Sequence, residues 1–214
     1  MIVLKVGGAS LAATELAVVD EAVVVHGAGP QISLEMERAG IPVEFVDGRR
    51  VTTPAGIEIV RAAYQRVNAM LCEAIGDRAV GLFGDEIGLK AERVPELGLV
   101  GDAIPSRPHA IVDALGTGKI PVVAPLAEGP LNVNADDAAA ALALGLGAEK
   151  LLFITDVDGL IVGGDVVDSI DVDEAGALLA GGTLQGGIIP KLSAAVTAAR
   201  GGVAAQIGNT AVLG

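Results

Sequence analysis

The segment from 132 to 159 constrains the possible folds of this chain more than any other part of its sequence. It reads NVNADDAAAALALGLGAEKLLFITDVDG, so alternating polar residues are followed by an Ala/Leu run and then by a short apolar stretch. The alternation predicts an extended segment, the Ala/Leu run a buried helix, and Leu151 to Ile154 a buried strand. An acidic residue just past such a strand, here Asp156, lies at the carboxyl edge of a parallel sheet, where α/β proteins bind ligands. The segment therefore predicts an α/β fold with a ligand site at this edge.

Asp136 has two interpretations. It follows Asn134 at a predicted helix N-terminus, which is typical of a capping group and needs no ligand. Capping does not require Asn132, Asn134 and Asp156 as well, so the segment as a whole favours a binding site. For Asp136 by itself, both interpretations stay open.

Composition limits the classes of ligand. The chain has 214 residues and is 51% hydrophobic, enough to bury a large core in one domain or two closely joined lobes. Its net charge of −13 argues against non-specific binding to nucleic acid or to an anionic membrane. An anionic ligand must therefore be held by a few local cations, by backbone amides or by a metal.

The start of the sequence, its apolar runs and its cysteine usage indicate a cytoplasmic protein. The longest apolar run, from Ala138 to Ala148, is too short to span a bilayer, and the start MIVLKVGG lacks the features of a signal peptide. Cys72 is the only cysteine, so an internal disulfide is excluded, and its apolar neighbours predict a packed thiol.

Predicted strands and helices alternate along the whole chain, which indicates a parallel sheet sandwiched between helices. An Asp47-Gly48 hairpin turn and a protruding hairpin from 86 to 101 interrupt this alternation. The strands are predicted at 1–6, 21–25, 79–83, 120–124, 151–154, 203–207 and 211–213, and the helices at 11–20, 30–39, 54–74, 108–115, 171–179 and from about 185 to 200.

Two glycine-rich junctions follow the first two strands. Lys5 precedes Gly7-Gly8, and His26 precedes Gly27-Ala28-Gly29-Pro30, where Pro30 fits the first turn of a helix. Backbone amides, a helix N-terminus and a nearby ammonium group would form a phosphate cradle, although the spacing is not that of a P-loop. Plain strand–turn junctions are the alternative. For His26 we expect a buried, hydrogen-bonded side chain without a catalytic role.

Three cations have contexts that suggest an anionic ligand. Arg49 and Arg50 follow the predicted hairpin turn, where an arginine could bind a carboxylate through two parallel hydrogen bonds. Lys191 lies in the first turns of the last helix, where the helix dipole disfavours a cation unless an anion is present. The alternatives are solvated charges on an edge strand and an exposed surface lysine.

Seven motifs, taken together and in this order, resemble those of the amino acid kinase family over nearly the whole chain. The resemblance implies a three-layer αβα sandwich with a mostly parallel central sheet. It also implies one domain over 1–214, with an acceptor-substrate lobe at about 1–130 and a nucleotide lobe at about 131–214. The motifs are VLKVGG (3–8), HGAGPQIS (26–33), GRRVTTP (48–54), LGLVGDA (97–103), NVNADDAA (132–139), LLFITDVDG (151–159) and GGIIPKL (186–192).

Within the family, the motifs are most similar to those of enzymes that act on N-acetyl-L-glutamate. The resemblance implies ATP-dependent phosphorylation of the side-chain carboxylate to an acyl phosphate, in arginine biosynthesis, with Mg²⁺ bound to the nucleotide and no protein metal site. A carboxylate is already a nucleophile at neutral pH, so the reaction needs positioning and cations rather than a general base. The roles that the resemblance implies are catalysis for Lys5, Lys191 and Asp136, substrate binding for Gly27, Ala28, Arg50, Asn132 and Asn134, and nucleotide binding for Gly7, Gly8, Asp156 and Gly187.

The chain also departs from the family pattern. Ala28 stands where the family usually has glycine, which predicts a methyl group at the approach to the substrate, and the segment after Lys191 is short, which predicts a reduced nucleotide lobe. The resemblance implies a homodimer, joined through the helix from Thr53 to Ala74. Two alternatives remain: a kinase for carrier-protein-linked glutamate or aminoadipate, and a catalytically silent nucleotide-binding protein on the same fold.

Overall fold

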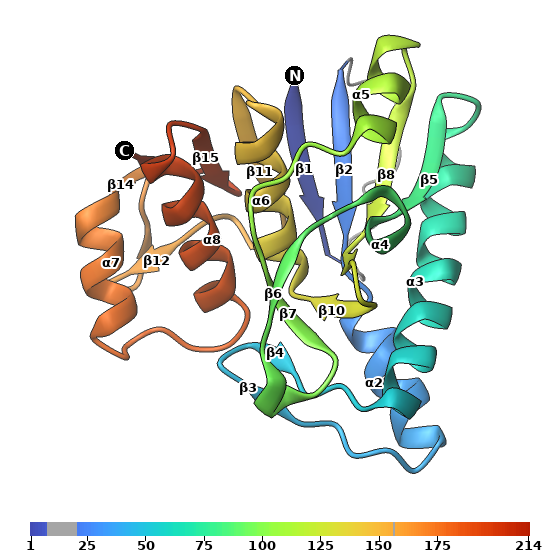
Figure 1. Ribbon diagram of the computed structural model, residues 1–214. Coiled ribbons are helices and arrows are strands. Elements are labelled where there is room, and N and C mark those ends of the chain that lie inside the picture. Colours follow the sequence, from blue (N-terminus) through green and yellow to red (C-terminus); the bar gives the residue numbers. More distant parts are fainter. Residues whose placement is uncertain (8–20, 156) are drawn as a thin grey trace.

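An eight-stranded sheet forms the centre of the computed structural model, which describes residues 1–7, 21–155 and 157–214 (Figure 1). The strand order is β14-β16-β15-β11-β1-β2-β8-β5, and within the described ranges every neighbouring pair is parallel except β15 with β16. The prediction of a mostly parallel sheet is confirmed. The strands are β1 (Ile2–Val6), β2 (Ala22–His26), β5 (Ala79–Phe83), β8 (Ile120–Ala124), β11 (Lys150–Ile154), β14 (Ser169–Asp171), β15 (Ala204–Ile207) and β16 (Thr210–Leu213).

Both faces of this sheet are apolar, because its inner strands are covered on both sides. In β1, Val3 belongs to one buried cluster while Leu4 and Val6 belong to another. The first cluster contains side chains of α6 (Ala135–Leu146) and α8 (Ile188–Arg200), and the second those of α2 (Gly29–Arg38) and α3 (Pro54–Ile75). Helices therefore cover each face, which confirms the three-layer sandwich.

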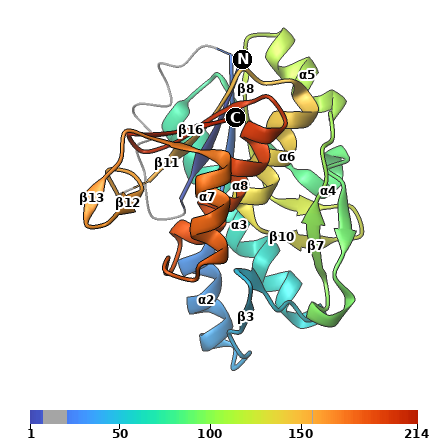
Figure 2. The same ribbon diagram turned by 90° about the vertical axis from the view of Figure 1, so that its left-hand side faces the viewer.

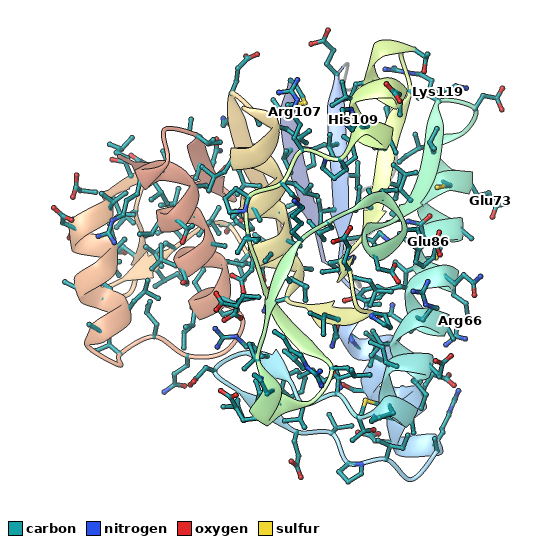
Figure 3. All side chains as sticks on the ribbon, in the orientation of Figure 1. Arg66, Glu73, Glu86, Arg107, His109 and Lys119 are labelled. Carbon is teal, nitrogen blue, oxygen red and sulfur yellow. The ribbon has the colours of Figure 1, made fainter. Side chains whose placement is uncertain are left out.

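The helices begin where the sequence signals predict. Thr53 caps α3 by accepting a hydrogen bond from the Gly56 amide, and proline follows at the first helical position. The outer face of α3 carries charged groups such as Arg66 and Glu73, which point away from the sheet (Figure 3). No helix within the described ranges has the length and apolarity needed to cross a membrane. The helix predicted at 11–20 lies outside the described residues. The remaining helices are α4 (Gly84–Ile87), α5 (His109–Gly116), α7 (Val172–Ala180) and a 3-10 turn, η1 (Pro95–Leu97).

The predicted Asp47-Gly48 hairpin is present but shorter than expected. Strands β3 (Phe45–Val46) and β4 (Arg49–Arg50) pair around Asp47 and Gly48, which have φ angles of 48° and 77°. The sequence predicts longer strands on the two sides of the turn, 42–46 and 49–52. The ladder ends early because Thr52 leaves it and exchanges hydrogen bonds with the segment 97–99 instead.

The predicted hairpin at 86–101 is part of a second sheet instead of protruding freely. Strand β6 (Ala91–Arg93) pairs antiparallel with β7 (Val100–Ala103), but β7 also pairs with β10 (Leu131–Val133), whose other neighbour is β9 (Leu126–Ala127). This second sheet holds β10 beside the central eight-stranded sheet. A further small hairpin, β12 (Ile161–Val162) and β13 (Asp165–Val166), lies on the other side of α7 and α8 from β7 (Figure 2).

The extended segment predicted from Asn132 to Asp136 ends earlier than expected. Asn132 lies in β10, Asn134 is the N-cap of α6, and Asp136 is already in the first turn of that helix. The chain changes from strand to helix at Asn134, because the Asn134 side chain accepts hydrogen bonds from the amides of the first helical turn. Asp136 therefore lies on a helix and not on the predicted extended segment.

Candidate active site

A pocket of about 490 Å³ opens where β1, β2 and β10 end, a size suited to a small ligand. Gly7 directly follows β1 but does not line this pocket, and Gly8 and Asp156 lie outside the described residues. The other residues predicted for the site all line it: Lys5, Gly27, Ala28, Arg50, Asn132, Asn134, Asp136, Gly187 and Lys191.

Three helices direct their N-termini at this pocket. Gly29 and Pro30 of α2, Ala135 of α6, and Gly187 just before α8 all line it. Each N-terminus carries the positive end of a helix dipole, although in α6 the Asp136 and Asp137 amides already donate to the Asn134 side chain. Together they make the pocket favourable for an anion even though the chain as a whole is acidic.

Lys5 and Asp136 form a buried ion pair at the floor of the pocket. The Lys5 Nζ lies 2.8 Å from Asp136 Oδ1, and each side chain is only 7% exposed. Lys5 comes from β1 and Asp136 from α6, which packs across that strand. Buried charges need a partner, so each holds the other in place. Capping of α6 is done by Asn134, so the capping interpretation of Asp136 is wrong.

Lys191 approaches the same pocket from the first turn of α8. Its Nζ donates a hydrogen bond to the carbonyl oxygen of Gly187 at 3.2 Å, which bends the side chain back toward the helix N-terminus. Lys191 lies next to Pro190 on the pocket wall, unlike an isolated surface lysine. Two ammonium groups from distant parts of the chain therefore line one cavity.

Arg50 is a buried guanidinium group without a carboxylate in ion-pair range within the described ranges. Its Nη2 donates to the Gly29 carbonyl at 3.0 Å and to Ser33 Oγ at 2.8 Å, and its face lies 4.5 Å from the centre of the Phe45 ring. Burial lowers the pKa of the Arg50 guanidinium, the direction expected for a desolvated cation. An anion entering the pocket would supply the missing counter-charge, so the solvated-charge alternative does not hold for Arg50.

The two asparagines have different environments. Asn132 is buried, and its Nδ2 donates to Thr52 Oγ1 at 3.0 Å. Asn134 uses its oxygen for the cap of α6, and its Nδ2 donates to the Gly48 carbonyl at 3.2 Å in the β3–β4 turn. Asn134 therefore ties the hairpin to α6, next to the pocket.

Two expectations for the second glycine-rich junction need correction. The Gly27 amide donates to the Val6 carbonyl at 3.0 Å, because the β1–β2 ladder continues one residue past β2, so this amide does not serve a ligand. The methyl group of Ala28 does not obstruct the pocket. Ala28 is 1% exposed and belongs to the core cluster with Ile32 and Met36. Its φ of −144° is accessible to any residue, which explains why alanine fits here.

Asp137 lies beside the site, in two neighbouring pockets, and the sequence analysis missed it although the Asp136-Asp137 doublet was a visible signal. Burial, with a smaller contribution from the charge of Asp136, raises the pKa of the Asp137 carboxyl to about 6. Nearby, Arg49 donates two hydrogen bonds to Asp102, at 2.5 and 3.0 Å. Arg49 also lines the pocket, but unlike Arg50 it already has a carboxylate partner, Asp102 of β7.

A second, apolar pocket of about 360 Å³ was also missed. It lies beside the first turn of α8, and no regular periodicity marks the loops that form it. Within the described ranges no group of three or more Asp, Glu, His or Cys side chains could hold a metal ion. The pocket is lined by Val157, Gly159, Leu160, Ile161, Thr183, Leu184, Gln185 and Ile188.

A sequence model of the amino acid kinase family matches residues 1–209. The chain belongs to this family. It is 42% identical to an acetylglutamate kinase of Rubrobacter xylanophilus, over 97% of this chain and 88% of that protein. It is 43% identical to an acetylglutamate kinase of Saccharopolyspora erythraea, over 85% of this chain and 66% of that protein. These matches confirm the resemblance carried by the seven motifs.

The match in length varies among the relatives. The chain spans between 55% and 69% of the length of six further acetylglutamate kinases, so much of those proteins has no counterpart here. Among solved structures, the protein smu.665 from Streptococcus mutans is similar over 99% of this chain and 98% of its own, with a TM-score of 0.86 and 26% identity. A protein that this chain matches over nearly its whole length therefore has a similar fold.

Proposed function

We propose that this chain is an acetylglutamate kinase, which transfers the γ-phosphoryl group of ATP to the side-chain carboxylate of N-acetyl-L-glutamate. The main support is one observation: Lys5, Arg50 and Lys191, together with three helix N-termini, line a single pocket. Such an arrangement suits a reaction in which one anion receives a phosphoryl group from another. The identity of 42% over nearly the whole chain to a protein named acetylglutamate kinase supports this choice of acceptor.

The chemical roles follow from charge and position. Lys5, held by Asp136, would neutralise charge on the transferring phosphoryl group from the sheet side, and Lys191 from α8. Arg50 would bind the α-carboxylate of the acceptor, and Asn132 the acetylated amino group. The γ-carboxylate attacks phosphorus directly, because an ionised carboxylate needs no general base. Catalysis then depends on alignment and charge stabilisation.

The nucleotide would enter from the side of α8. The apolar pocket next to Ile188 could take the adenine ring, and the amide of Gly187 would contact the phosphates. We keep Gly7, Gly8 and Asp156 as predicted nucleotide contacts. Mg²⁺ bound to ATP would neutralise phosphate charge. Bound through the phosphates, it needs no dedicated protein cage.

Location and assembly remain part of the proposal. We infer a cytoplasmic homodimer that contacts neither nucleic acid nor membrane, in keeping with the net charge of −13. The dimer would form through α3. Sedimentation analysis that finds a monomer at micromolar concentration would contradict this assembly without affecting the assigned reaction.

Release of ADP from MgATP, measured with a panel of acceptors, tests the proposed function. We expect N-acetyl-L-glutamate to give a kcat/KM at least ~100-fold above those of L-glutamate, L-aspartate and carbamate, because a site with placed polar groups rejects ligands that leave them unpaired. The Lys191→Met variant supplies the background rate. Turnover no higher than this background, or turnover only of glutamate linked to a carrier protein, would contradict the proposal.

A further inference from the structure

A buried polar group lies directly behind the Gly27–Ala28 turn, and the proposed reaction does not use it. His26, the last residue of β2, is fully buried and receives the side chain of Asn68 from α3. The Asn68 Nδ2 lies 3.1 Å from His26 Nε2 and donates to the Val122 carbonyl at 2.8 Å. On the other side of the ring, His26 Nδ1 lies 3.4 Å from the Gly27 carbonyl.

The donors and acceptors in this group determine where the imidazole proton is. The Asn68 amide nitrogen can only donate, and its two hydrogens serve Val122 and His26. The amide orientation is consistent, because Asn68 Oδ1 accepts from the Cys72 thiol at 3.6 Å. Nε2 of His26 must then be the unprotonated acceptor, so the proton is on Nδ1 and is directed at the Gly27 carbonyl.

The environment also keeps the imidazole neutral and its ring plane fixed. Burial lowers the pKa of His26 to about 4, so the imidazole is neutral at neutral pH. Tyr64 packs edge-on against the ring with a centroid distance of 5.8 Å. The hydrogen bond to Gly27 is therefore made by a side chain that has little freedom to turn.

Holding the Gly27 carbonyl also sets the direction of the next amide. The described residues include no cis peptide bond, and in a trans peptide the C=O and the following N–H point in opposite directions. With the Gly27 carbonyl turned toward His26, the Ala28 N–H points away from the ring. Ala28 borders the pocket, and within the described ranges no protein acceptor receives its N–H.

We propose that His26 and Asn68 are positioning residues, which fix the Gly27–Ala28 peptide so that the Ala28 amide donates to the phosphoryl group during transfer. This inference rests on the proposed function. It assigns a task to the histidine for which the sequence indicated only burial. It also means that Asn68, on α3 behind the pocket wall, helps to set the contact between the Ala28 amide and the phosphoryl group.

The Asn68→Leu variant tests this role, because leucine keeps the volume and removes both hydrogen bonds. We expect kcat to fall about 10- to 100-fold, while KM for MgATP and for N-acetyl-L-glutamate changes less than about threefold, since the lost alignment matters mainly in the transition state. Val67→Ala is the matched control: Val67 is buried in the same helix and has no bond to His26. It should lower the melting temperature with kcat preserved.

A spectroscopic measurement keeps the test independent of variant stability. The chain has two histidines, and the other, His109, lies on α5 near the opposite end of the sheet (Figure 3). In a His109→Gln protein labelled with ¹⁵N-histidine, the His26 ring should show protonated Nδ1 and bare Nε2 at neutral pH. Asn68→Leu should mix the two tautomers and, in uniformly ¹⁵N-labelled protein, shift the Ala28 amide signal.

Two results would overturn the inference. One is an Nε2–H tautomer or an imidazolium at neutral pH in the otherwise intact protein. The other is a kcat for Asn68→Leu equal to that of Val67→Ala. A wild-type protein that does not phosphorylate N-acetyl-L-glutamate would instead contradict the proposed function, while the tautomer would still report on the positioning of the peptide.

Discussion

The Lys5–Asp136 pair shows how a single contact determines both stability and the charge of the site. Replacing Asp136 with asparagine leaves the Lys5 ammonium buried without its counter-charge, since both residues are 5% exposed. We expect a loss of about 3–5 kcal/mol in the free energy of unfolding, measured with urea, together with loss of turnover.

A double-mutant cycle is the control for this prediction. Lys5→Met combined with Asp136→Asn removes both charges, so the double variant should be more stable than the sum of the single losses implies. Strictly additive losses would contradict a direct coupling between the two side chains.

Asp137 gives a prediction with a defined pH dependence. Its pKa is raised from 3.8 to about 6 in the folded protein, mainly by burial. Below about pH 4 the carboxyl is protonated in both folded and unfolded states and has no effect on stability. Above about pH 6 it is ionised in both, and the folded state then contains a poorly solvated carboxylate, which destabilises it.

The Asp137→Asn variant should therefore be more stable than the wild type at about pH 8, by on the order of 2 kcal/mol, with the difference vanishing near about pH 4. Urea unfolding at several pH values measures this difference. The attraction of Arg49, which lowers the pKa of Asp137, is already contained in the value of about 6. A difference that is the same at all pH values would contradict a raised pKa.

At the scale of elements, the cap of α6 connects helix formation to the position of the β3–β4 turn beside the pocket. Asn134→Ala removes the acceptor for the Asp136 and Asp137 amides and the contact with Gly48. We expect a loss of about 1 kcal/mol in unfolding free energy and a KM for the acceptor raised about three- to tenfold, because the hairpin loses its anchor.

Thr53→Ala is the matched control, since Thr53 caps α3 in the same way without touching the β3–β4 turn. It should lose a similar stability and leave the acceptor KM unchanged. Equal increases in KM for both variants would mean that stability alone causes the effect.

The elements themselves could largely be predicted from the sequence, since apolar periodicity and capping signals are local. The long helix α3 begins at Pro54 as expected and ends at Ile75, next to the predicted Ala74. Features that depend on distant partners could not be predicted. Thr52 leaves its hairpin for the segment at 97–99, and the Gly27 amide is used by Val6, because of neighbours that no local pattern specifies.

At the scale of the whole molecule, the order of strands brings the site together. Lys5 on β1 lies beside β2 and under α6, and crossovers between parallel strands place the helix N-termini at the same edge. The sequence predicted the cations and this edge. It could not supply the counter-ion of Arg49, the raised pKa of Asp137 or the apolar pocket, because each arises from residues that meet only in the folded chain. The division into two lobes stays a prediction, since one sheet runs through both.

The central claim is that Lys5 and Lys191 act together on a phosphoryl group moving from ATP to a carboxylate. Trapping the product with hydroxylamine tests it most directly, because an acyl phosphate gives a hydroxamate and ATP hydrolysis does not. We predict hydroxamate from N-acetyl-L-glutamate that depends on MgATP and falls at least ~100-fold in Lys191→Met with the fold intact. ADP formed without hydroxamate, or an undiminished yield in Lys191→Met, would contradict the account.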